Sequence, residues 1–240
     1  MRTLWVALNM LVATVPLSLV IIGAALLGIR GRIYDDIARL WSRWFLWASG
    51  ARVRIIGYEN IHEERPQIVA SNHQSWMDVV ALAGNMPGAF KFVAKKELGR
   101  IPFFGWGWRA AGHISIDRSD TASAIRSLDR AGDIMRRLHA KVVIFPEGTR
   151  SPTGEMLPFK KGAFMLAIHT GVEIVPVGVS GGRSILRKGD WRIRPGEITL
   201  RIGEPIPMAG HSSDTRDALM ARVRAEIESL RHASPSTATA

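Results

Sequence analysis

A histidine and an aspartate form the first group in this chain that could do chemistry. His73 and Asp78 lie in the segment NHQSWMD, which follows the apolar run Ile68–Ala70. On a regular helix, two residues five apart point about 140° away from each other, so the spacing predicts His73 in a loop and Asp78 in the first turn of a helix. There the carboxylate can hold one imidazole nitrogen while the other accepts a proton. An alternative stays open, because Ser75-x-x-Asp78 is also a helix capping box.

A second polar segment, FPEGTRS at residues 145–151, comes at the end of the apolar run Val142–Phe145. In open α/β sheets, ligands bind beyond the carboxyl ends of the strands. Gly148 would let the backbone approach a ligand closely, and Arg150 offers a two-pronged donor for a phosphate. Glu147 could orient Arg150 or accept hydrogen bonds from hydroxyls. The alternative is a polar turn with a surface ion pair.

A third stretch, Lys95–Trp106, mixes cations with turn residues and aromatic side chains. It could bind an anionic headgroup beside an acyl chain, or its aromatics could be core and its lysines a solvated face. Arg118 follows the apolar run Ile114–Ile116 and is another cation at a predicted strand end. It could instead pair on the surface with Asp117 or Asp120.

The elements that must position these residues alternate between short apolar runs and helical patterns. This alternation predicts an α/β fold, a single mixed-sheet domain with helices on its faces, over residues 51–232. The tail, residues 233–240, has nothing to bury and is expected to be disordered. Helices are predicted between Ile116 and Val142, from about Met165 to His169 and from about Thr215 to Leu230. The predicted strands are Val53–Ile56, Ile68–Ala70, Phe90–Ala94, Ile114–Ile116, Val142–Phe145, Ile174–Val179 and Ile198–Ile202.

The first 50 residues predict a membrane anchor. No ionisable side chain occurs from Thr3 to Ile29, a run longer than the roughly 20 apolar residues that cross a bilayer. It also exceeds the apolar region of about 7–15 residues in a cleaved secretory signal, which disfavours that interpretation. Because Pro16 removes a backbone donor near the middle, the run could be one kinked helix or a hairpin of two short helices.

Cations follow the apolar run, which predicts that the downstream domain lies on the cytoplasmic side of the membrane. Apolar and aromatic residues then recur at near-helical spacing from Ile37 to Trp47, a pattern that suits a helix lying in the membrane interface. The alternative is a core helix whose aromatic residues pack inward. The cations are Arg30, Arg32, Arg39 and Arg43, against a single Arg2 ahead of the run.

The net charge and the absence of cysteine limit the partners and the kinds of site that this chain can have. The chain carries 32 Lys and Arg against 21 Asp and Glu, a formal charge of +11, which indicates an anionic partner such as a membrane surface, an acidic substrate or nucleic acid. It has no cysteine, which excludes disulfides, a thiolate nucleophile and cysteine-based metal sites.

Four segments, NHQSWMD, LGRIPFFGW, FPEGTRS and IVPVGVSG, occur in this order. They resemble the four motifs of the glycerolipid acyltransferase family, which includes the 1-acyl-sn-glycerol-3-phosphate acyltransferases. The resemblance spans about Ile56 to Pro207. It implies a catalytic His73 and Asp78. It also implies an acceptor site for glycerol phosphate and supporting motif positions. The acceptor residues are Glu147, Gly148, Thr149, Arg150, Arg118, Lys95 and Lys96, and the supporting positions are Asn72, Gly99, Pro102, Gly105, Pro146 and Pro176.

The resemblance further implies a reaction. A fatty acyl group would pass from a thioester, on coenzyme A or acyl carrier protein, to the sn-2 hydroxyl of 1-acyl-glycerol-3-phosphate, giving phosphatidic acid. Glycerol 3-phosphate or another lysolipid is the alternative acceptor. The expected partners are membrane lipids, lysophosphatidic acid and the acyl donor. No nucleic acid, metal or cofactor is expected.

Two other functions compete with this one. Gly178–Gly182 matches the G-x-S-x-G pattern of serine hydrolases around Ser180, with Asp190 and His211 following in a permitted order. A nucleophile elbow needs a helix after the serine, and the glycines that follow predict none. A membrane-tethered binder of nucleic acid or anionic lipid is the second competitor, but the chain lacks a recognisable nucleic-acid-binding motif.

Overall fold

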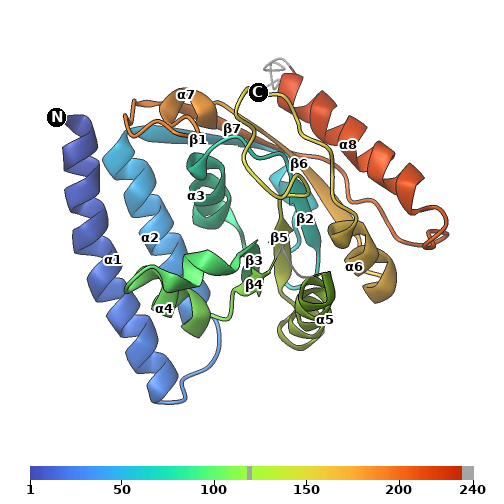
Figure 1. The fold of residues 1–240 in the computed structure, drawn as a ribbon, viewed down its shortest axis with the longest axis horizontal. Helices are drawn as coiled ribbons and strands as arrows, with labels where there is room; N and C mark the ends of the chain where they lie inside the picture. The colour runs from blue at the N-terminus through green and yellow to red at the C-terminus, as the bar shows by residue number, and fades with distance from the viewer. Residues whose placement is uncertain (118–120, 234–240) are drawn as a thin grey trace.

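The computed structural model describes residues 1–117 and 121–233, with the backbone alone for residues 121–125. Its centre is a seven-stranded sheet in the order β1-β7-β6-β2-β5-β3-β4, in which every pair is parallel except β6 with β7 (Figure 1). The predicted mixed-sheet α/β fold is therefore confirmed. The strands are β1 Ala51–Ile56, β2 Ile68–Ser71, β3 Phe90–Lys95, β4 Ile114–Ile116, β5 Lys141–Ile144, β6 Ile174–Ser180 and β7 Gly196–Ile202.

Helices cover both faces of the sheet (Figure 1). Successive side chains of a strand point to opposite faces, so Val69 packs into the core beneath α2, α3 and α4, whereas Ile68 and Ala70 pack beneath α5, α6 and α8. This double coverage explains why the central strands are continuous apolar runs. The helices are α1 Arg2–Leu26, α2 Ile33–Ser49, α3 Trp76–Asn85, α4 Phe104–Ala110, α5 Thr121–Leu138, α6 Gly162–Thr170, α7 Gly182–Ile185 and α8 Arg216–His232, with short 3₁₀ turns at η1 Tyr58–Asn60 and η2 Lys96–Arg100.

The apolar N-terminal run forms one helix, α1, which continues through Pro16, and it does not divide into a hairpin of two short helices. The helix is long and apolar enough to cross a membrane. One side, with Leu4, Leu8 and Leu11, is exposed, whereas the opposite side packs against α2 and α4. An unpartnered apolar side of this kind is typical of a helix that contacts lipid.

The predicted helix at residues 37–47 is α2, and its aromatic residues divide between two surroundings. Trp41 and Phe45 pack against the core, whereas Trp44 and Trp47 are exposed. Inward packing is therefore confirmed for part of the helix, whereas the position of the exposed tryptophans in a membrane interface stays a prediction.

A buried ion pair fastens α2 to the sheet. Lys91 Nζ on β3 lies 2.6 Å from Asp35 Oδ1, and both side chains are at least nine-tenths buried. Arg39 and Arg43 add hydrogen bonds of 2.8 Å to the carbonyls of Met86 and Gly84. Separating α2 from the sheet would leave Lys91 as a buried charge without its partner, which is strongly unfavourable. The α2 helix is therefore packed as part of the folded domain.

The other predicted helices are α5, α6 and α8. The α6 helix begins three residues before the predicted start and ends at Gly171, which adopts the left-handed conformation. The predicted disordered tail falls almost wholly outside the described residues, which end at 233.

Candidate active site

The two polar motifs meet at one edge of the sheet. NHQSWMD follows β2 and FPEGTRS follows β5, and these strands are adjacent and parallel. The carboxyl ends of parallel neighbours lie at the same edge, where open α/β sheets bind ligands. Residues separated by about seventy positions in the sequence are thereby brought into contact.

His73 and Asp78 contact each other as the spacing predicts. His73 Nδ1 lies 3.1 Å from Asp78 Oδ2, and the Asp78 side chain is 1% exposed. The same oxygen accepts hydrogen bonds from the backbone N–H of Gln74 at 2.6 Å and of Ser75 at 2.7 Å, and the capping box with Ser75 is complete. The capping box and the contact with the imidazole therefore occur together, since one carboxylate caps α3 and holds the ring.

The backbone of His73 is held on both sides by the second motif. Its N–H donates to Glu147 Oε1 at 2.7 Å, and its carbonyl accepts from the Ser151 N–H at 2.8 Å. The imidazole stacks on Phe145, with ring centroids 4.0 Å apart. These contacts fix the ring and leave its Nε2 as the nitrogen available to a substrate.

Asn72 ties the same loop to β6. Its side-chain amide exchanges two hydrogen bonds with the backbone of Val179, at 2.8 and 2.7 Å, so that it extends the β2–β6 pairing by one step. A side chain that imitates a backbone pair explains an asparagine directly before the histidine.

Glu147 is buried and faces the protein rather than a ligand. Both carboxylate oxygens accept backbone hydrogen bonds, Oε1 from His73 and Oε2 from Leu157 at 2.9 Å. Burial raises the pKa of Glu147, although these two hydrogen bonds act in the opposite direction. Within the described residues it makes no hydrogen bond to Arg150, so its expected role in binding the acceptor stays a prediction.

A cavity of about 510 Å³ begins beside His73 and extends between α1, α2, α3 and α4 and the sheet. This volume suits a small-molecule ligand. Most of its lining is apolar, with Trp41, Phe92 and Phe104 among the contributors. His113 also lines it, and burial lowers the pKa of this histidine well below its ordinary value, so the imidazole is neutral at neutral pH.

Of the cations predicted to bind the acceptor, Arg150 and Lys95 line the cavity and Lys96 does not. Arg150 lines the cavity with its guanidinium 5.5 Å from the centre of the Trp76 ring, and within the described residues it has no acidic partner. Burial lowers the pKa of Arg150, an effect that the nearby Asp78 opposes, and an arginine remains charged in any case. Gly148 and Thr149 line the cavity beside Arg150, and Gly148 has a positive φ of 71° that favours glycine.

The two lysines predicted to bind the acceptor differ in their position relative to the cavity. Lys95 lines the cavity and lies 3.4 Å from Glu97. Lys96 pairs with Asp117 instead and lies outside the cavity lining. Arg118 lies outside the described residues.

The segment LGRIPFFGW forms a tight turn that places α4 over the cavity. A Cβ atom on Gly105 would lie 2.5 Å from the backbone carbonyl of Gly99, so the approach of α4 to the preceding turn requires glycine. Pro102 and Phe103 connect the two, and Phe103 takes an unusual positive φ of 59°. The other two supporting prolines belong to other motifs: the Pro146 carbonyl accepts a hydrogen bond from the Lys160 N–H, and the Pro176 carbonyl, on β6, accepts one from the Gly203 N–H.

Residues 52–180, more than half of the chain, match the model of the Acyltransferase family. The chain belongs to this family. It is 34% identical over 210 residues to the 1-acyl-sn-glycerol-3-phosphate acyltransferase alpha of Homo sapiens, covering 87% of this chain and 74% of the human protein. It is also 34% identical over 217 residues to a 1-acyl-sn-glycerol-3-phosphate acyltransferase of Pseudomonas aeruginosa, covering 88% and 83% of the two chains.

The acyltransferase also resembles a solved structure along its whole length. The crystal structure of the 1-acyl-sn-glycerophosphate (LPA) acyltransferase PlsC from Thermotoga maritima has a TM-score of 0.80 and 30% sequence identity, covering 98% of this chain and 97% of that chain. The family resemblance of the four motifs is therefore confirmed, and with it the expectation of an acyltransferase enzyme.

The structure also corrects one argument about Ser180. A short helix, α7, does follow this residue, although the glycines predicted none. The hydrolase interpretation fails on geometry instead, because no hydrogen bond joins Ser180, Asp190 and His211 within the described residues and Asp190 pairs with Arg194 at 3.3 Å.

Proposed function

We propose that this acyltransferase moves a fatty acyl group from a thioester to the sn-2 hydroxyl of 1-acyl-glycerol-3-phosphate, giving phosphatidic acid. The observation that carries the proposal is the His73–Asp78 pair beside an apolar cavity that also contains Arg150, a cation without an acidic partner among the described residues. A base, an anion site and room for acyl chains are the parts that this reaction needs. The names of the relatives from Homo sapiens and Pseudomonas aeruginosa support the choice of acceptor.

In the proposed mechanism, His73 Nε2 takes the proton of the lysolipid hydroxyl as its oxygen attacks the thioester carbonyl. The tetrahedral intermediate then collapses, the carbon–sulfur bond breaks, and the imidazolium returns the proton to the leaving thiolate. Asp78 keeps the imidazole in the tautomer with Nδ1–H and stabilises its charged form. The imidazole is neutral again at the end of the cycle, so no covalent enzyme intermediate is required.

Arg150 would bind the acceptor phosphate through parallel N–H groups, and Lys95 would add a second positive charge. Fixing the phosphate places the sn-2 hydroxyl near Nε2, and such positioning is a large part of catalysis between two substrates. The neighbouring apolar lining would receive acyl chains.

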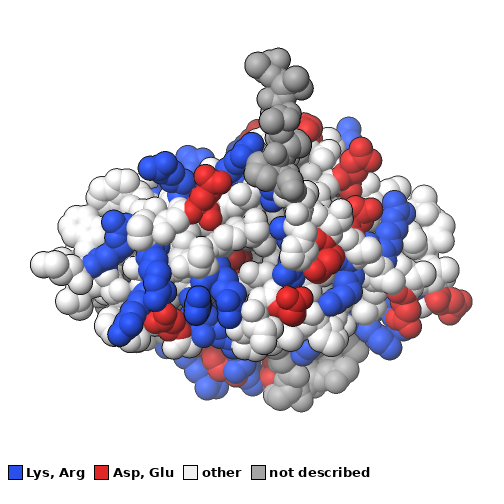
Figure 2. All heavy atoms as spheres, turned by 90° about the horizontal axis from the view of Figure 1, so that it is seen from above, with Lys and Arg blue, Asp and Glu red and all other residues white. Residues whose placement is uncertain are grey.

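The exposed side of α1 would anchor the enzyme in the membrane, with the catalytic domain on the cytoplasmic face. Lys and Arg gather toward one end of the face seen in Figure 2, and α7 and the segment after it lie toward that end in Figure 1. In this segment Arg187 and Lys188 are exposed, and Lys188 Nζ donates to the carbonyl of Arg150 at 2.7 Å. Cations beside the active site suit a membrane surface or substrates that carry phosphates.

The proposal is tested by supplying membranes that contain the enzyme with radiolabelled acyl groups on coenzyme A and on acyl carrier protein. Each donor is combined in turn with lysophosphatidic acid, glycerol 3-phosphate and a phosphate-free lysolipid. We expect labelled phosphatidic acid from the first acceptor with at least one donor. Faster labelling of either other acceptor would contradict the proposed substrate.

The Arg150→Ala variant should raise the KM for lysophosphatidic acid by about 10- to 100-fold, since hydrogen bonds to charged groups contribute about 1.5–3 kcal/mol. Arg150→Lys should recover part of this loss. Initial rates at varied acceptor and saturating donor measure the effect. Lys96→Ala is the matched control, because Lys96 pairs with Asp117 outside the cavity. An unchanged KM in Arg150→Ala would remove the phosphate role from this residue.

A further inference from the structure

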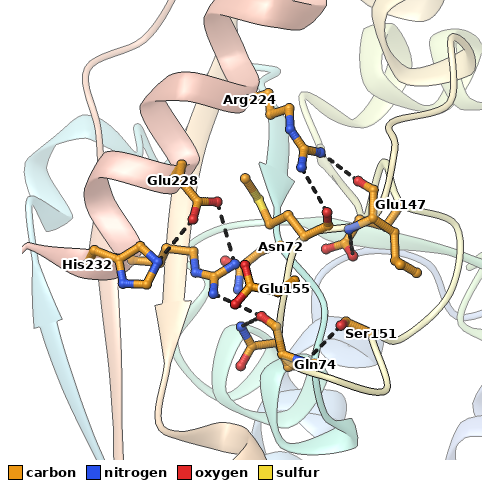
Figure 3. A network of polar contacts seen from close by, with 12 residues as sticks. Asn72, Gln74, Glu147, Ser151, Glu155, Arg224, Glu228 and His232 are labelled. Carbon is orange, nitrogen blue, oxygen red and sulfur yellow. Dashed lines mark hydrogen bonds and ion pairs between the residues drawn. The ribbon is translucent and has the colours of Figure 1, made fainter.

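Two arginines of the C-terminal helix α8 hold the loop that follows the FPEGTRS motif (Figure 3). Arg224 donates to the carbonyls of Leu157 at 2.6 Å and Met156 at 2.8 Å, and Arg231 donates to the carbonyl of Gly154 at 2.9 Å. The two arginines are seven residues apart, about two helical turns, and so project from the same side of α8.

The loop held by α8 is the one that holds His73. The Leu157 N–H donates to Glu147 Oε2 at 2.9 Å, and Glu147 Oε1 accepts from the His73 N–H at 2.7 Å. On the other side, Gly154 accepts from Gln74 Nε2 at 2.9 Å as well as from Arg231. A continuous series of hydrogen bonds therefore leads from α8 to the backbone of the candidate base.

The hydrogen bonds from α8 restrain a loop that has no regular structure of its own. The segment after Gly148 is irregular, without helix or strand up to residue 160, and irregular segments open locally at a low free-energy cost. A guanidinium that binds two successive carbonyls restrains such a segment more than a single donor does. Arg224 is itself held, because its guanidinium lies 5.2 Å from the centre of the Phe159 ring.

The charge of Arg224 acts on Glu147 as well. Burial raises the pKa of Glu147, the hydrogen bonds from the Leu157 and His73 N–H groups lower it, and the positive charge of Arg224 adds a smaller effect in that same downward direction. The ionised carboxylate accepts a hydrogen bond at each oxygen, whereas protonation turns one oxygen into a hydroxyl, which is a donor and a weaker acceptor. Arg224 thus favours the form of Glu147 that can hold His73 and Leu157 together.

We infer that Arg224 is a positioning residue of the acyltransferase, which keeps the His73 loop in its reactive geometry through Met156, Leu157 and Glu147. The inference rests on the proposed catalytic role of His73. By this inference α8, which lies beyond the matched family region of residues 52–180, also contributes to the rate of acyl transfer. Arg224, Met156, Leu157 and Glu147 do not line the cavity, so the effect is expected in kcat rather than in substrate binding.

The kinetic test compares Arg224→Ala with Arg222→Ala, an exposed arginine of the same helix. We expect Arg224→Ala to lower kcat by about 10- to 100-fold, since a displacement of about 1 Å at a reacting group costs up to about 100-fold. The KM for lysophosphatidic acid should change by less than about threefold, and Arg222→Ala should match the wild type. Arg224→Lys, which can reach one carbonyl, should give an intermediate kcat.

A double-mutant cycle tests whether Arg224 affects His73 through Glu147. If Arg224 acts through Glu147, the loss of kcat in the Arg224→Ala/Glu147→Gln double variant is smaller than the product of the two single losses. Multiplicative losses would overturn the inference, as would a kcat in Arg224→Ala equal to that of Arg222→Ala.

Hydrogen exchange gives a measurement that is independent of the reaction. In the wild type the His73 amide is protected by its bond to Glu147, and Arg224→Ala should accelerate its exchange while Arg222→Ala does not. If Arg224→Ala does not fold, Arg224→Lys is measured in the same way, and wild-type exchange in that folded variant would overturn the inference. Failure of the proposed role of His73 would appear differently, as full acyl transfer in His73→Ala, and failure of the proposed substrate would appear as faster labelling of another acceptor.

Discussion

The His73→Ala variant is expected to lose acyl transfer by about 10²- to 10⁴-fold, the usual contribution of a general base. His73 Nδ1 is held by Asp78 at 3.1 Å and the ring is stacked on Phe145, so Nε2 is the atom positioned for the proton of the acceptor. Alanine removes that atom, while the buried Asp78 carboxylate keeps its hydrogen bonds from the backbone N–H groups of Gln74 and Ser75. The loss should appear in kcat at saturating lysophosphatidic acid and thioester, with expression and membrane association unchanged.

The matched control is His169→Ala, an exposed histidine on α6, which should retain full turnover. Asp78→Asn tests the partner. Asparagine can still accept one of the backbone hydrogen bonds that Asp78 accepts, but it cannot stabilise an imidazolium, so we expect a loss in kcat of about 10²-fold or more. Turnover close to normal in His73→Ala would reject the proposed mechanism, whatever the result for Asp78.

The second large effect is expected from Gly182→Ala, at the start of α7. A Cβ atom on Gly182 would lie 2.3 Å from Asp78 Oδ1 and 3.3 Å from Ser75 Cβ. Asp78 has no room to retreat, because it is buried and its Oδ2 accepts hydrogen bonds from two backbone N–H groups besides contacting His73. The added methyl group therefore displaces either the carboxylate or α7.

We expect Gly182→Ala to lower kcat by about 100-fold, the cost of a displacement of about 1 Å at a reacting group. Steady-state kinetics measure the loss, and thermal unfolding in detergent shows whether the fold survives. Gly23→Ala is a suitable control, since nothing lies within 4 Å of the added atom at Gly23. Wild-type turnover in Gly182→Ala would show that this contact does not constrain Asp78.

The regular elements were predictable because their signals are local. Each strand is a short apolar run bounded by turn residues, and each main helix repeats its apolar residues at helical spacing. Pro16 gave an ambiguous signal, since a proline can kink a helix or end it, and the structure continues α1 through it. The short helix α7 was missed because Gly181 and Gly182 carry no helical pattern, although Gly182 is needed for close packing against Asp78.

The core of the site was predictable for a different reason. His73 and Asp78 are five residues apart, so their contact depends on one loop and one helix start, and chain geometry nearly determines it. The role of Glu147 was harder to predict, because its partners, the His73 and Leu157 N–H groups, come from two loops. Neither composition nor spacing indicates that a strand-end carboxylate will face inward to backbone donors rather than outward to a ligand.

By itself, the sequence determined the family, the α/β fold, the apolar N-terminal helix and the contact between His73 and Asp78, since each depends on local pattern or on motifs with fixed spacing. Only the tertiary structure decided which cations share a cavity with His73, that α1 and α2 form part of its wall, and that Arg224 lies behind the loop that holds His73. These features join segments far apart in the chain. Their contacts are set by how the strands are ordered and the helices packed, which residue types and spacing do not encode locally.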